Sequence, residues 1–136
     1  MKRTIWLATA VFMILVLVAS AAAPGALAAP IPTKDPASPN GVYIVQMLDE
    51  PVVAYEGTIK GLKATAPKRP EKVDPLNPDV VAYVTYLKGK HDTTLAIVGG
   101  GKKVYDYAYT FNGFAAKLTE AQAAKMVTLP GVLSVS

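Results

Sequence analysis

The sequence has no cysteine and only one histidine, His91. Without cysteine, the chain can form neither a disulfide framework nor a thiolate metal site. A Ser/His/Asp triad would have to use His91, and a metal site would have to combine that single imidazole with carboxylates. The sequence therefore predicts no catalytic, metal-binding or cofactor-binding residues.

The sequence also lacks a concentrated charge of one sign. Its formal net charge is +4, but two of its 14 basic residues, Lys2 and Arg3, belong to the N-terminal segment described next, which leaves 12 against 10 acidic residues. Beyond that segment, basic neighbours occur only at Lys68-Arg69 and Lys102-Lys103. Nucleic-acid binding usually needs a basic stripe with stacking aromatic residues. We expect a solvated surface and no nucleic-acid partner.

The N-terminal segment has the pattern of a secretory signal peptide. Two basic residues precede an apolar run, Ile5 to Val18, and small residues then lead to Ala26-Leu27-Ala28, an A-x-A cleavage pattern. We predict a signal peptide over residues 1–28, cleaved after Ala28, and a secreted protein that keeps no membrane association. The alternative is an uncleaved anchor, because Ile5 to Ala23 is almost long enough to span a bilayer. Either reading places the rest of the chain outside the cytoplasm.

Residues 29–40 carry four prolines among small and polar residues and predict an extended linker. The remaining length, residues 41–136, suffices for one small domain. Its first element, Val42 to Met47, is rich in β-branched and aromatic residues and predicts a strand. From Asp49 to Asn77, scattered prolines and glycines exclude a long helix and leave the conformation open.

Two helices are predicted downstream. Asn77 caps the first helix, Pro78 fits its first turn, and Gly99-Gly100-Gly101 ends it. Thr119 and Gln122 form a capping box for the second helix. Apolar residues recur at helical spacing on one face of the first helix: Val80, Val84, Leu87, His91, Leu95 and Val98.

The segment from Lys103 to Leu118 predicts a β-hairpin. Asn112-Gly113 is the favoured pair for a two-residue type I′ turn, which would place Phe111 opposite Phe114. One face of the hairpin is then aromatic and is expected to form the core: Tyr105, Tyr107, Tyr109, Phe111, Phe114, Ala116 and Leu118. The other face is small and nearly flat: Val104, Asp106, Ala108, Thr110, Ala115 and Lys117.

A closing strand from Val132 completes the order strand, helix, strand, strand, helix, strand. With right-handed crossovers this is an α+β, ferredoxin-like fold. Its four-stranded antiparallel sheet carries two helices on one face. The other face is open, as antiparallel sheets tolerate.

Several short motifs occur in an order that is typical of a known family. They are Tyr43-Ile44-Val45-Gln46, His91-Asp92-x-x-Leu95, Tyr105-x-Tyr107, Phe111-Asn112-Gly113-Phe114-Ala115-Ala116-Lys117-Leu118-Thr119 and Leu129-Pro130-Gly131-Val132. In this order they resemble the inhibitor I9 family, the N-terminal propeptides of subtilisin-like serine proteases. Ala54 to Thr65 resembles the insertion of its longer secreted bacterial members.

This resemblance implies a non-catalytic domain that acts as an intramolecular chaperone and temporary inhibitor of a subtilisin-like protease. The open sheet face would pack on two helices of the catalytic domain, and we expect the small hairpin face to be that docking surface. We expect no homo-oligomer. Because the sequence stops at the last strand, it is interpreted as the N-terminal fragment of a protease precursor. The alternatives are a free-standing inhibitor acting in trans and, more remotely, a ferredoxin-like ligand-binding module.

His91 has two interpretations. Its position on the apolar helix face favours a packed, hydrogen-bonded core histidine. The alternative is a pH sensor, because histidine titrates near physiological pH and some protease propeptides use one as an activation switch.

Overall fold

The computed structural model describes residues 38–136. The predicted signal peptide, its cleavage after Ala28 and residues 29–37 of the predicted linker lie outside these residues. Within residues 38–136, no helix is both long and apolar enough to cross a membrane.

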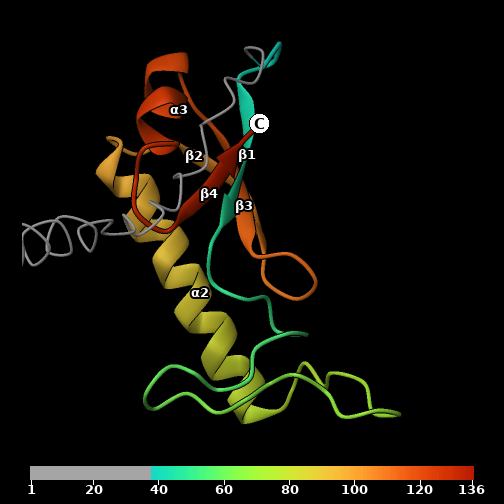
Figure 1. The fold of residues 1–136 in the computed structure, drawn as a ribbon. Coiled ribbons are helices and arrows are strands. Elements are labelled where there is room, and N and C mark those ends of the chain that lie inside the picture. The colour runs from blue at the N-terminus through green and yellow to red at the C-terminus, as the bar shows by residue number, and fades with distance from the viewer. Residues whose placement is uncertain (1–37) are drawn as a thin grey trace, which may run out of the picture. The chain divides into compact units, whose positions relative to one another are not determined.

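Six elements follow one another in the predicted order (Figure 1). The strands form one antiparallel sheet in the order β2-β3-β1-β4, so β3 and β1 are central. This order, with two helices, confirms the α+β, ferredoxin-like prediction. The elements are β1 (Val42–Met47), α2 (Pro78–Ile97), β2 (Lys102–Tyr107), β3 (Gly113–Lys117), α3 (Glu120–Met126) and β4 (Val132–Val135).

Both helices begin where the sequence predicts. The Asn77 side chain accepts a hydrogen bond from the backbone N–H of Asp79 at 2.8 Å, and Pro78 is the first residue of α2. Before α3, the Thr119 side chain and Gln122 form the reciprocal capping box. The Gln122 amide also donates to the carbonyl of Gly100 at 2.8 Å. The start of α3 is thereby tied to the glycine segment that ends α2.

The main core lies between the sheet and the two helices, which pack on the same face (Figure 1). Burial alternates along β1, where Tyr43, Val45 and Met47 are buried while Ile44 is exposed. This alternation is typical of a central strand with one covered face. The remaining core residues come from α2, β3, α3, β4 and positions next to them, and β2 contributes none: Leu95, Val98, Phe114, Ala116, Leu118, Ala123, Met126 and Val135.

A second core involves the long segment between β1 and α2. The backbone N–H groups of Val52 and Val53 donate to the carbonyls of Ala108 and Tyr109 at 2.8 and 3.0 Å. The ring of Tyr55 stacks on that of Tyr83 with centroids 3.7 Å apart. The segment is therefore packed on the first half of α2 and on the β2–β3 loop. Its cluster comprises Val52, Tyr55, Val80, Tyr83, Leu87 and Ala108.

The hairpin register differs from the prediction. Tyr107 pairs with Gly113 and Asp106 with Phe114, so residues 108–112 form a five-residue loop. Asn112 does not have the positive φ that a type I′ turn requires, so the predicted two-residue turn is wrong. A Cβ on Gly113 would lie 2.1 Å from the carbonyl oxygen of Val45. The glycine is needed there for close approach to β1 rather than for a turn.

Two sets of contacts favour the longer loop. Ala108 is buried in the second core and accepts a backbone bond from Val52, and Asn112 is buried and bonded through its side chain. A tight turn at Asn112 would have broken both. In addition, β2 is irregular between Lys103 and Tyr105. Tyr105 and Tyr109, predicted as core, are therefore 60% and 40% exposed, whereas Phe114, Ala116 and Leu118 are buried as predicted.

Tyr83 offers a test of the second core. Its hydroxyl donates to the carbonyl of Glu50 at 2.6 Å. Burial, with the nearby Asp49 charge, raises the pKa of Tyr83, so the hydroxyl stays protonated as this bond requires. We predict that Tyr83→Phe lowers the free energy of unfolding by about 1 kcal/mol, because a partly buried carbonyl loses its donor.

Urea denaturation measures this change, with Tyr105→Phe as the control, because Tyr105 is largely exposed. Equal stabilities of the two variants would contradict a structural role for the Tyr83–Glu50 bond.

Candidate functional site: the open face of the sheet

The helices cover one face of the sheet, and the strand register defines the residues on the other. Ile44 and Tyr105 both pair with Ala115, and Gln46 and Tyr107 both pair with Gly113, so these side-chain positions share one face. We call this the open sheet face. It consists of Val42, Ile44, Gln46, Lys102, Tyr105, Tyr107, Gly113, Ala115, Lys117 and Ser134.

The centre of the open sheet face is apolar. Ile44 is 43% exposed although it lies on a central strand. Ala115 lies between Ile44 and Tyr105, and Gly113, the next residue on this face of β3, has no side chain. The rings of Tyr105 and Tyr107 lie beside one another with centroids 4.9 Å apart. Gly113 and Ala115 are thus flanked by larger residues on both neighbouring strands, and of these only Gln46 is not apolar or aromatic.

The predicted docking residues do not share one face. Ala115 and Lys117 lie on the open sheet face, but Asp106 pairs with Phe114 and therefore points toward the helices. Ala108 is buried in the second core. Thr110 is exposed in the β2–β3 loop, and Val104 is exposed at the irregularity in β2. The prediction that these six form one flat surface is wrong, because it rested on the two-residue turn.

The hairpin pattern alone does not place Ile44, Tyr105 and Tyr107 on the open sheet face. Ile44 could have been found from β1, because alternation along Tyr43-Ile44-Val45 places it opposite the core residues. For the tyrosines the sequence carries no comparable signal, because their face depends on the loop length and on the irregularity in β2.

A buried polar network fixes the loop beside the open sheet face. The two ring nitrogens of His91 lie 2.8 Å from Asp106 Oδ1 and 2.8 Å from Asn112 Oδ1. The Asn112 amide donates to the carbonyl of Asp49 at 2.8 Å, and the Asp49 carboxylate pairs with Lys90 of α2 at 2.6 Å. His91 is fully buried. The packed, hydrogen-bonded histidine predicted from the helix pattern is confirmed.

Asp106 connects this network to the surface. Burial by itself raises the pKa of a carboxyl, but the hydrogen bonds from Lys103 and His91 outweigh this and hold the pKa of Asp106 below its ordinary value. Lys103 Nζ lies 2.9 Å from Asp106 Oδ2 and also contacts Asp92 of α2. Asp106 therefore remains ionised and joins β2 to α2.

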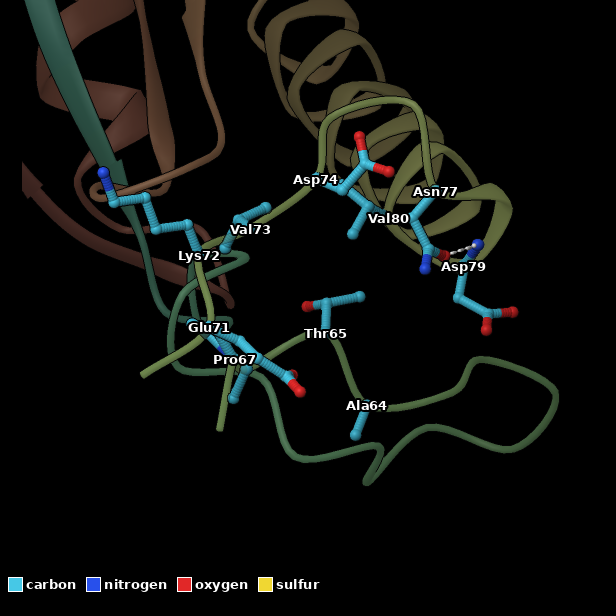
Figure 2. A pocket seen from close by; sticks show the side chains of 11 residues that line it. Ala64, Thr65, Pro67, Glu71, Lys72, Val73, Asp74, Asn77, Asp79 and Val80 are labelled. Atoms are coloured by element: carbon cyan, nitrogen blue, oxygen red, sulfur yellow. Dashed lines mark hydrogen bonds between the residues drawn. The ribbon is translucent and has the colours of Figure 1, made fainter. Parts of the chain in front are cut away.

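A second hollow lies elsewhere, in the segment before α2. It has a volume of about 430 Å³, and its lining includes Thr65, Glu71, Asp74 and Asp79 (Figure 2). The Thr65 hydroxyl already donates to the carbonyl of Val52, and the Asn77 side chain to which Figure 2 draws a bond caps α2. In residues 38–136, no buried side-chain nitrogen or oxygen lacks a partner and no group of residues could hold a metal ion. Thr65 and Asn77 in this hollow thus already bond within the domain.

The comparisons with known proteins agree with the geometry. A model of the peptidase inhibitor I9 family matches residues 42–136, which includes every strand and both helices. The chain belongs to the peptidase inhibitor I9 family. An I9 domain is an inhibitor domain and not a catalytic one.

The curated relatives of this I9 domain are plant proteases. It is 40% identical over 97 residues to the subtilisin-like proteases SBT2.6 and SBT2.5 of Arabidopsis thaliana, a match that covers 69% of this chain and 12% of each relative. A third, SBT3.3 of the same plant, is 43% identical over 56 residues. The chain thus spans about an eighth of its first two relatives and corresponds to their N-terminal region. These relatives give no support to the bacterial type suggested by the insertion. No solved structure matches the chain.

Asp106 yields a prediction for the stability of the I9 domain. Because its pKa is lowered in the fold, its ionised form stabilises the protein above the unfolded pKa of about 3.9, and this stabilisation disappears as the pH falls through the folded pKa. We predict that Asp106→Asn lowers the free energy of unfolding at pH 7 by about 1–3 kcal/mol. The difference in the free energy of unfolding between Asp106→Asn and wild type should shrink below about pH 4.

Urea midpoints between pH 7 and pH 3 measure this effect. Asp92→Asn is the control, because Asp92 also contacts Lys103 but its side chain is 64% exposed, and such pairs contribute little. A difference between wild type and Asp106→Asn that stays constant over the whole pH range would contradict the role assigned to the ionised carboxylate.

Proposed function

We propose that this I9 domain is the propeptide of a secreted subtilisin-like serine protease, that it assists folding of the catalytic domain, and that it then inhibits that domain temporarily. The main support for this proposal is that a domain of the I9 family has an apolar, uncovered sheet face, the open sheet face. The family match and the subtilisin-like proteases among the relatives support the partner. The signal-peptide pattern of the sequence supports secretion.

The open sheet face has the composition of a protein interface. Aromatic residues are enriched in such interfaces, and the removal of apolar surface from water favours association. Two partner helices can approach a sheet closely only where its side chains are short, and Gly113 and Ala115 give β3 such a strip between β1 and β2. The proposed docking surface therefore follows β3 and its two neighbours.

Contacts within the domain hold this surface in place. Gly113 is packed against the backbone of Val45, and the loop that precedes it is anchored through Asn112 to α2 and to the end of β1. Binding then orders few additional groups, which lowers the entropic cost of association. A preformed surface also suits a template on which a catalytic domain folds.

Action in cis is favoured over a free-standing inhibitor. The matched region is the N-terminal part of relatives that are roughly eight times longer than the match. In such a protein the domain is linked to its protease, and the effective concentration of the two partners is high. Moderate affinity for the catalytic domain would then suffice for both roles.

The direct experiment measures inhibition and refolding. The 136-residue chain is added to a panel of subtilisin-like proteases that includes mature Arabidopsis SBT2.5 and SBT2.6, with trypsin as an unrelated serine protease. We expect inhibition, or faster recovery of activity from the denatured state, for at least one panel member and none for trypsin. No effect on any member in either assay would contradict the proposal.

Ala115→Trp tests the docking surface. The indole would stand at the centre of the open sheet face and hold a partner helix away, so we predict an inhibition constant raised at least about tenfold, the equivalent of about 1.4 kcal/mol. Val81→Trp is the control, because Val81 is exposed on α2 and does not belong to the open sheet face. Unchanged inhibition by Ala115→Trp, with circular dichroism that shows an intact fold, would contradict docking through this face.

A further inference from the structure

Two lysines stand opposite one another on the open sheet face. Lys102 of β2 and Lys117 of β3 are direct register partners, and both are exposed. Like charges in this position destabilise a sheet. Within residues 38–136, neither lysine takes part in an ion pair. Their neighbour Lys103, in contrast, contacts two carboxylates on the helix side of the sheet.

Protection of the sheet edge explains only one member of this pair. β2 is an edge strand, and a lysine on an edge strand discourages pairing with another chain. Lys117 lies on β3, between β2 and β1, and protects no edge. The fold of the free domain therefore gives no reason for a positive charge at position 117.

The pair lies at the border of the apolar centre. Lys117 is two residues from Ala115 on the same face, and it pairs with Val42 of β1 on its other side. A partner that covers Ile44 and Ala115 must also approach the ammonium group of Lys117. Removing a charge from water without a partner is costly, so a surface that fits here must supply a negative group.

We propose that Lys102 and Lys117 form a carboxylate-binding subsite that receives an aspartate or glutamate side chain from the protease surface docked on the open sheet face. This inference rests on the proposed function and adds to it the chemistry of the partner. One carboxylate between the two ammonium groups relieves their mutual repulsion and can bond to both. The subsite speeds association and selects proteases that carry an acidic residue at this point of the interface.

The experiment measures association rates by surface plasmon resonance, with an active-site-blocked protease that the wild-type chain inhibits. The test variant is Lys102→Glu/Lys117→Glu. The control is Lys60→Glu/Lys88→Glu, which changes the net charge equally at two exposed lysines in the insertion and on α2. We expect the test variant to associate with the protease at least about tenfold more slowly than wild type at low salt, and the control to differ from wild type by less than about threefold. The difference in association rate between the test variant and wild type should narrow at about 0.5 M salt.

A single variant separates binding from stability. Lys117→Glu places opposite charges across β2 and β3, so we expect a slightly higher urea midpoint together with weaker docking. A protease in which the aspartate or glutamate bound by the subsite is replaced by lysine should again bind the Lys102→Glu/Lys117→Glu variant.

The outcomes are distinct. Equal slowing by the test and control variants would show a nonspecific effect of net charge and overturn the subsite, as would unchanged association of the test variant. If the wild-type chain binds no subtilisin-like protease, the proposed function itself fails, and the subsite fails with it.

Discussion

The rest of the structure depends on the hydrogen bonds of the buried Asn112 side chain. It joins three parts of the chain, because its oxygen faces His91 of α2 and its amide donates to the carbonyl of Asp49 after β1. This position sets the end of the β2–β3 loop and the start of β3. The register of β3 against β1 and β2 follows, and with it the identity of every residue on the open sheet face.

The local part of the fold could be predicted from the sequence, because its determinants are local. Asn77 and Pro78 begin α2, and the capping box of Thr119 and Gln122 begins α3, through contacts within three residues. The hairpin register could not be predicted. Asn112-Gly113 favours a tight turn in isolation, but in the folded chain the asparagine bonds to residues 21 and 63 positions away. Asn112 and Gly113 are therefore needed for contacts with distant parts of the chain, and not for a local turn.

The same distinction explains the site. Ala115 and Lys117 were predicted on the docking surface because they lie in β3, whose alternation survives a change of loop length. Asp106 and Ala108 were misplaced because β2 has an irregularity and ends at Tyr107. The two sides of the sheet therefore differ in what their residues do. The helix side holds the buried polar network and both cores, while the open side keeps apolar groups and unpaired lysines that do not stabilise the free domain. A surface of this kind is typical of a protein whose binding partner completes it.

The proposed function requires a subtilisin-like protease to cover the open sheet face. Hydroxyl-radical footprinting of the complex tests it most directly, because two tyrosines of similar reactivity report on different surfaces. Tyr105 lies on the open sheet face and Tyr109 in the loop beyond it, and both are substantially exposed in the free domain. We predict that the protease protects Tyr105 strongly while Tyr109 remains reactive. Tyr105 that is as reactive in the complex as in the free chain would contradict it.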